Sequence, residues 1–384
     1  MFLLFIATKV YRFFDLCNIF MLKSVKNWGG KGTLFIDGRY KQPVFELTMK
    51  NFRLFETEAE HNEAVIEECS VSYVVESNKV YTTPENNGGQ GDVDYSAMYT
   101  TLEVSKDAYV RFANASAPAS LMEEISTPYE YSYDGINWIP YDDSEIHLTS
   151  GQQILWKGYY EKWSGNKGFV VYEKDEYGYP SNWVDFIVYG NVMSLLYGDE
   201  FYGKTEIPEG CGLGELFRGS SLIDASNLIL PATTLDNGCY QFMFTGCEKL
   251  TTAPELPATE LTERCYDGMF QYCTSLTTAP ELPATTLDNG CYQFMFAGCE
   301  KLTTAPELPA TTLADGCYDG MFQGCTNLNH ITMLAIDVSA DNCLYYWVNG
   351  VSATGTFVKH PDMDSLPTGI HGIPEGWTVE DSVI

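Results

Sequence analysis

Cysteine is the residue whose spacing in this chain most invites a chemical interpretation. Nine of the 12 cysteines recur at fixed intervals, and many form Cys-x7-Cys pairs such as Cys239 and Cys247. Zinc sites gather Cys and His ligands, but no such cluster accompanies these pairs. A cysteine repeated at one site of a repeat behaves as a small buried hydrophobe, and its parallel Cβ atoms suit a disulfide poorly. We therefore predict free structural thiols.

Catalytic groups are sparse in the sequence. The five histidines are scattered, and no nucleophile or phosphate-binding motif is present. Two carboxyl groups can form a glycosidase site, and Asp142, Asp143 and Glu145 are the nearest candidates. Among 52 acidic residues, such a group arises by chance. We predict a non-enzymatic protein with no catalytic residue, no metal site and no cofactor.

Aromatic side chains are better candidates for ligand contacts. Sugar rings and protein surfaces both pack well against exposed aromatic rings. Residues 93–190 contain four tryptophans, of which some must be core in a domain of this size. Trp163 lies in a polar turn and is the best candidate for an exposed one. The four are Trp138, Trp156, Trp163 and Trp183.

Two further rows of residues recur every 26 positions. If the tyrosine row is exposed, it forms an aromatic ligand-binding strip, and if it is buried, it is core. The glutamate row places like charges on neighbouring repeats, which suits either a divalent cation or a solvated edge. The tyrosines are Tyr240, Tyr266, Tyr292 and Tyr318, and the glutamates are Glu255, Glu281 and Glu307.

A tandem repeat must position these rows. Leu-Pro, Met-Phe and both cysteines recur every 26 residues between Leu230 and Leu334. This period predicts one structural unit per repeat, stacked so that equivalent side chains form columns. Residues 250–253 predict a brief parallel strand that ends at Pro254. Residues 239–246 predict a local turn or short helix that stops at Gly246.

The repeat resembles a known family. Residues 239–254 read Cys-Tyr-x-x-Met-Phe-x-Gly-Cys-x-x-Leu-Thr-x-Ala-Pro, which is similar to the BspA-type leucine-rich repeat. The form with Leu-Pro-Ala-Thr-Thr-Leu added is similar to repeats of gut anaerobes and their phages. The resemblance covers about 190–384 and implies a leucine-rich-repeat solenoid used in adhesion and surface binding. It implies no catalytic motif.

The rest of the chain divides by its turn signals and composition. We expect a mainly β protein in which a β-sandwich precedes the repeat solenoid with its short parallel strands and caps. The predicted segments are an apolar N-terminal segment at 1–20, a small β-rich module at 21–85, a linker at 86–92, the sandwich at 93–190 and the solenoid at 191–384. Residues 1–20 are too interrupted by charge to span a membrane and resemble no export signal, and Met21 is an alternative start.

Charge is distributed unevenly along the chain. The net charge is −30, yet residues 1–50 contain eight Lys/Arg and three Asp/Glu, which gives +5. An acidic body argues against nucleic-acid binding. The basic head either docks onto an assembly partner or is merely a solvated module. We expect a surface-binding or adhesion protein that presents its repeats to a host-surface glycan or protein. The favoured interpretation is a phage virion fibre or decoration protein. The alternatives are a bacterial cell-surface adhesin and a purely structural virion component.

Overall fold

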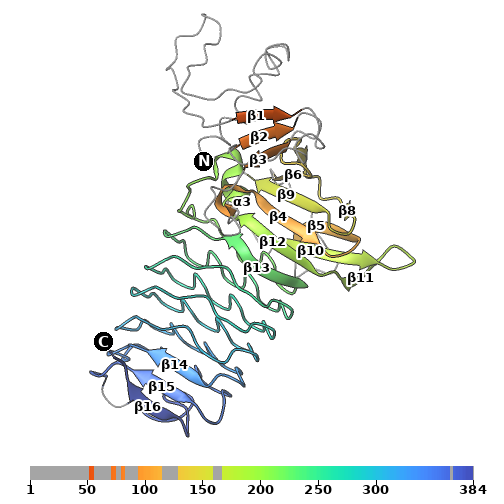
Figure 1. Ribbon diagram of the computed structural model, residues 1–384. Helices are drawn as coiled ribbons and strands as arrows, with labels where there is room; N and C mark the ends of the chain where they lie inside the picture. The colour runs from red at the N-terminus through yellow and green to blue at the C-terminus, as the bar shows by residue number, and fades with distance from the viewer. Residues whose placement is uncertain are drawn as a thin grey trace, which may run out of the picture. The chain divides into compact units, whose positions relative to one another are not determined.

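The protein is mainly β, with very little helix (Figure 1). The computed structural model describes the strand residues 52–55, 71–74 and 79–82, together with residues 94–114, 129–158, 167–363 and 366–383. The chain forms two compact units, Met1–Val93 and Asp94–Ile384. Within the described ranges, no helix has the length and apolar character needed to cross a lipid bilayer.

The first unit contains a three-stranded sheet. Strand β1 (Phe52–Phe55) pairs in parallel with β2 (Val71–Val74), which pairs antiparallel with β3 (Lys79–Thr82). Apolar and polar residues alternate in this antiparallel pair, as in Val71-Ser72-Tyr73. The predicted segment 1–20 and linker 86–92 lie outside the described residues.

Two sheets form the first part of the second unit. Trp156 belongs to one sheet and is fully buried between the two. Its ring contacts Phe112 and Phe169, which both belong to the other sheet. One sheet has the order β11-β10-β5-β8, and the other has the order β13-β12-β4-β9-β6-β7. Their strands are β4 (Thr100–Val104), β5 (Ala108–Asn114), β6 (Tyr129–Ser132), β7 (Ile139–Pro140), β8 (Ile146–Leu148), β9 (Gln153–Gly158), β10 (Lys167–Lys174), β11 (Pro180–Trp183), β12 (Phe186–Asn191) and β13 (Leu222–Ile229).

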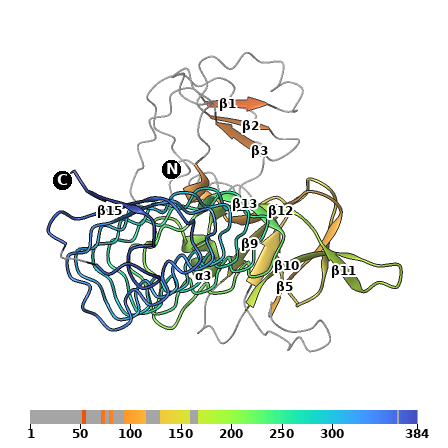
Figure 2. The same cartoon turned by 90° about the horizontal axis from the view of Figure 1, so that it is seen from below.

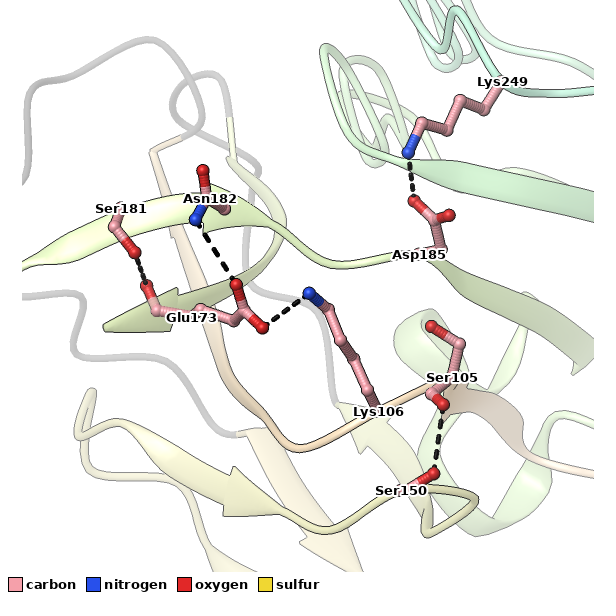
Figure 3. Close-up of polar contacts among 8 residues, drawn as sticks. All are labelled: Ser105, Lys106, Ser150, Glu173, Ser181, Asn182, Asp185 and Lys249. Atoms are coloured by element: carbon pink, nitrogen blue, oxygen red, sulfur yellow. Dashed lines mark hydrogen bonds and ion pairs between the residues drawn. The ribbon is translucent and has the colours of Figure 1, made fainter. Parts of the chain in front are cut away.

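The six-stranded sheet continues directly into the repeats. Strand β12 pairs antiparallel with β4 on one side and in parallel with β13 on the other. Between them the chain forms two short helices, α3 (Ser194–Tyr197) and η3 (Gly198–Glu200). Lys249 of the repeats bonds to Asp185 just before β12, at 2.5 Å (Figure 3). One hydrophobic core therefore runs from the sheets into the repeats.

Residues 239–342 form a stack of four 26-residue coils, here called the repeat stack (Figure 1). Alternate backbone N–H groups of each coil donate to carbonyls of the next, as from Tyr240 to Cys265 at 3.0 Å and from Phe244 to Met269 at 2.9 Å. Seen from below, the coils overlie one another (Figure 2). Rings of the phenylalanine column are parallel within 10° and 5.3–5.8 Å apart. Equivalent side chains therefore form the columns that the period predicts.

Turns, not helices or strands, build most of each coil. Every fourth residue of the arc 238–246 has a left-handed backbone, with φ of 63° at Gly238, 57° at Phe242 and 75° at Gly246. The short-helix alternative for this arc is therefore wrong. The predicted parallel strand at 250–253 is reduced to one bridge, Thr252 to Thr278, because Pro254 has no N–H to extend the pairing.

Different residues close the two ends of the stack. At the start, Phe217 stacks on Phe244 at 5.5 Å, a spacing of 27 residues that differs from the regular repeat. At the end, Trp347 takes the methionine position and donates its indole N–H to Gly372 O at 2.8 Å. A final parallel sheet follows the order β14-β15-β16, made of β14 (His330–Met333), β15 (Thr356–Lys359) and β16 (Thr378–Asp381).

Neighbouring coils of the stack are not equivalent. The fifth residue of the arc is Phe242, Gly268, Phe294 and Gly320 in successive coils. Each phenylalanine ring lies over the glycine of the next coil: a Cβ added to Gly268 would lie 2.4 Å from the Phe242 ring. The coils therefore pair in an alternating order, and the structural repeat is two coils long.

Gly268→Ala tests this pairing. Gly268 and Gly316 share a left-handed backbone, but a Cβ on Gly316 would meet no atom within 4 Å. We expect Gly316→Ala to lower the free energy of unfolding by about 1–2 kcal/mol through backbone strain alone. Gly268→Ala should cost a further 1–3 kcal/mol or so because its methyl group overpacks against Phe242. Chemical denaturation measures both, and equal losses would contradict the ring-over-glycine contact.

Ten cysteines lie in the described ranges, and all are buried thiols that form no disulfide. Burial raises the pKa of the nine repeat-column thiols, to about 12 for Cys247 and Cys265, so their reactive thiolate is scarce at neutral pH. We expect these ten thiols to resist a thiol-specific reagent in the native protein and to react once guanidinium unfolds it. Rapid reaction of repeat-column cysteines in the native state, located by peptide mapping, would contradict their burial.

Candidate ligand-binding groove

A shallow groove of about 330 Å³ lies on the outer face of the repeat stack. Three columns line it, because residues 26 positions apart lie on adjacent coils. The outer column offers carboxylate and amide groups to solvent, and the middle column is mostly glycine or flexible polar side chains. The outer column is Glu263, Asn289, Asp315 and Asp341, the middle column is Arg264, Gly290, Gly316 and Asn342, and the inner column is Gln293 and Asp319.

The inner column alternates between amide and carboxylate. Gln293 Nε2 donates to Asp319 Oδ2 at 2.8 Å, and Gln241 Nε2 donates to Asp267 Oδ2 at the same distance two coils earlier. Each bond joins one coil to the next across the same junction as the phenylalanine-over-glycine contact. In the groove, the Gln293–Asp319 bond fixes both side chains and uses one carboxylate oxygen, so the second oxygen of Asp319 and the carbonyl of Gln293 can accept hydrogen bonds from a ligand.

Asp267 is the more deeply placed of the two carboxylates. It is 2% exposed, and its Oδ1 has no hydrogen-bond partner among the described residues. Burial raises the pKa of Asp267, although the Gln241 bond and the charge of Arg264, 3.6 Å away, lower it. Burial also raises the pKa of Asp319, with Gln293 opposing it. The folded state therefore disfavours ionisation at both sites.

Asp267→Asn tests this electrostatic cost. A raised folded-state pKa means that the folded protein is stabilised by protonation, so stability from this group falls as pH rises through the unfolded and then the folded pKa. At neutral pH, we expect Asp267→Asn to be neutral or stabilising by up to about 1 kcal/mol, because the amide oxygen still accepts from Gln241. The gain should disappear at acidic pH. Denaturation at both pH values measures it, and a large loss at neutral pH would contradict the sign.

The tyrosine column lies inside the stack. Tyr240, Tyr266, Tyr292 and Tyr318 are each 1–2% exposed, and adjacent rings stack 5.8–6.1 Å apart. Each tyrosine follows an inward-facing cysteine at a turn, and the next coil covers its ring. The reading of this column as an exposed ligand-binding strip is therefore corrected: these residues are core.

The tryptophans have three different environments. Trp156 is core, Trp138 is half-buried beneath the Lys157 ammonium at 4.3 Å, and Trp163 lies outside the described residues. Trp183 on β11 is 54% exposed, and Tyr177 and Tyr179 in the adjoining turn are more exposed still. These three aromatics, here called the hairpin aromatics, form a second candidate contact surface.

Hydrogen bonds hold this β10–β11 hairpin in place. Asp175 Oδ1 accepts the backbone N–H groups of Tyr177 and Tyr179 at 3.0 and 2.8 Å. Glu173 accepts from Lys106 at 2.5 Å and from Asn182 at 3.4 Å, as Figure 3 shows. The hairpin aromatics thus project from a fixed turn, and they are not among the residues that line the groove on the repeat stack.

The carboxylates nominated for glycosidase chemistry have unsuitable environments. Bonds from the Ser144 hydroxyl and backbone N–H lower the pKa of Asp142. Burial raises the pKa of Glu145, but bonds from Lys174 and Tyr172 outweigh it and leave the value lowered. The general acid of a glycosidase needs a raised pKa. Asp142 and Glu145 therefore do not form such a pair in this arrangement.

The glutamate row Glu255, Glu281 and Glu307 is exposed and lies outside the groove. Across the described part of the chain, no three His, Cys, Asp or Glu residues gather closely enough to hold a metal ion. Gln293 and Asp319 are the inner groove residues that the rows of identical residues do not reveal. Their signal is weaker: the Gln/Asp and Phe/Gly positions alternate, so they recur every 52 residues, not every 26.

Comparisons with known proteins leave the site to be interpreted from its own geometry. No protein-family model matches the chain, and no curated protein and no solved structure shows significant similarity to it.

Proposed function

We propose that this protein is a non-enzymatic binding protein whose groove holds a surface glycan. The observation that carries the proposal is the groove itself, in which amides and carboxylates stand in register on four successive coils. Hydroxyl-rich ligands match such a surface because carboxylates accept hydrogen bonds while amides both donate and accept. The backbone ladder between coils keeps these groups in fixed positions, which lowers the entropic cost of binding.

The architecture proposed for this display is a β-sandwich followed by a leucine-rich-repeat solenoid of the BspA type. The two facing sheets support the first part, and the aligned columns with single parallel bridges support the second. Extended repeat surfaces of this kind suit recognition better than catalysis. We interpret the irregular first coil at Phe217 and the last coil at Trp347 as the two caps of this solenoid.

A glycan array tests the ligand class. We expect the full-length protein to bind a subset of neutral glycans and to release no sugar products from them. A pull-down from bacterial surface extracts runs in parallel. Binding only to protein baits, with an array that stays blank, would replace the glycan proposal by a protein-binding one. Hydrolysis of an array glycan that Asp142→Asn or Glu145→Gln abolishes would replace it by an enzyme.

The location proposed first is a phage virion, with a bacterial surface as the alternative. The resemblance of the repeats to phage-encoded ones supports it, as does the order of a basic head and an acidic display region. In this arrangement the head would contact the assembly partner. Mass spectrometry of purified particles and of host outer membranes should find the chain in the particles. Its recovery only from membranes would favour the bacterial adhesin.

A further inference from the structure

A half-buried aromatic residue recurs at every second coil, next in sequence to the inner column of the groove. These residues are Phe242, Phe294 and Tyr346, and each immediately follows the column of Gln241, Asp267, Gln293 and Asp319 or its continuation at Tyr345. The residues at the same place in the intervening coils are Gly268 and Gly320. The aromatic row therefore has a period of two coils.

Backbone strain marks this row. Phe242, Phe294 and Tyr346 have φ of 57°, 51° and 49°, a region that bulky residues rarely occupy. Gly268 and Gly320 occupy the same conformation without steric cost. Strain of this kind is found at functional positions, but Tyr272 outside the groove has the same backbone, so strain by itself does not assign a role to this row.

Two of the three aromatics, Phe242 and Phe294, follow the glutamine of an amide–carboxylate pair. Gln293, the residue before Phe294, is bonded to Asp319, and Gln241, the residue before Phe242, is bonded to Asp267. The Phe242 ring already stacks against a planar group, the Arg218 guanidinium, 5.5 Å from its centroid. One ring and one amide–carboxylate pair therefore repeat together along the stack.

We infer that the groove binds a linear, uncharged polysaccharide that lies along the stack, with one disaccharide per two coils. This inference rests on the proposed function and names its ligand. Two coils advance by roughly 10 Å, a length comparable to that of one disaccharide in an extended glycan chain. A pyranose ring offers a C–H face to the aromatic and hydroxyl groups to the amide and carboxylate.

The charge of the groove limits the class of ligand that it can bind. The groove carries the carboxylates of Glu263, Asp315, Asp319 and Asp341 against one guanidinium, that of Arg264. An anionic polymer would be repelled, which disfavours nucleic acids and acidic capsules. A basic protein would satisfy the charge but not the regular alternation of ring and amide–carboxylate pair. Binding of a basic protein is therefore the competing outcome of the test.

The test uses the full-length protein and ladders of cello-, xylo- and chito-oligosaccharides, from dimer to decamer. We expect affinity to rise in disaccharide steps until the groove is filled and then to level off. If the dimer binds as tightly as the decamer, the two-coil register is wrong although glycan binding stands. If no ladder is bound, or if only basic proteins bind and salt releases them, the proposed function fails as well.

Phe294→Gly separates the binding role of the ring from a role in folding. The substitution installs the residue that the alternate coils already carry and removes the left-handed strain. We expect about tenfold weaker binding of the long oligosaccharides, with the thermal midpoint little changed. The matched control is Tyr272→Gly, which relieves a left-handed residue of φ 60° at an exposed site outside the groove. Unchanged affinity in folded Phe294→Gly protein, or equal losses in both variants, would overturn the inference.

Discussion

Removing one coil should destabilise the protein more than removing two. Deletion of 265–290 joins Arg264 to Cys291 and places the Phe242 ring against Phe294 instead of a glycine. Deletion of 265–316 joins Arg264 to Cys317, so Phe242 lies over Gly320 and Gln241 faces Asp319. We expect the one-coil deletion to carry an overpacking cost of about 1–3 kcal/mol that the two-coil deletion avoids.

Equilibrium denaturation in guanidinium measures both deletions. The control is the one-coil deletion carrying Phe294→Gly as well, which restores a glycine under Phe242 and should recover most of the loss. In a stack of equivalent coils, stability falls with each coil removed. If the two-coil deletion is the less stable of the two and Phe294→Gly rescues nothing, the alternating order of coils has no energetic weight.

Loss of the amide–carboxylate pair should abolish most of the glycan binding. The double variant Gln293→Ala/Asp319→Ala removes both partners of the 2.8 Å bond, so neither is left buried and unpaired. We expect at least about a tenfold loss of affinity, since a bond to a charged group contributes about 1.5–3 kcal/mol. The free energy of unfolding should change much less, because Asp319 is only partly buried.

Glu281→Ala/Glu307→Ala is the matched control for this variant. It removes two acidic residues that also repeat every 26 positions but lie outside the groove. Isothermal titration with the tightest-binding ladder oligosaccharide compares the two variants with the unaltered protein. Equal losses in both would indicate a general effect of charge and would contradict a site at Gln293 and Asp319.

The column geometry could be predicted because identical residues recur at a fixed interval. Buried leucine, methionine, phenylalanine and cysteine must contact their counterparts when coils stack, whatever the local backbone. The backbone itself could not be predicted this way. Phenylalanine at 242 gives no sign of a left-handed conformation, and four apolar or β-branched residues before Pro254 are typical of a strand. In the structure, inter-coil bonding shifts to alternate residues of the arc, and only one bridge forms at Thr252.

The sheets show the same division. Apolar residues alternate between turn signals in β4, β5, β6, β8, β9 and β10, which is why β structure over 93–190 could be predicted. Strand β11 was not predicted, because its residues are all exposed and include Pro180. Strand β12 was not predicted either, since its partner β13 lies beyond residue 190, where the repeats were expected to begin. The inner column of the groove alternates between Gln and Asp in successive coils. A search for identical residues every 26 positions does not detect this alternation, because its period is 52 residues.

Hydroxyl-radical footprinting with and without the bound oligosaccharide tests the central claim most directly. Aromatic rings are labelled where solvent reaches them, and such rings lie on the β10–β11 hairpin and next in sequence to the inner column of the groove. The groove assignment predicts that the ligand protects Phe294, Tyr345 and Tyr346 and leaves the hairpin aromatics Tyr177, Tyr179 and Trp183 unchanged. Protection of the hairpin aromatics, with Phe294 labelled as before, would contradict it and place the glycan on the β10–β11 hairpin.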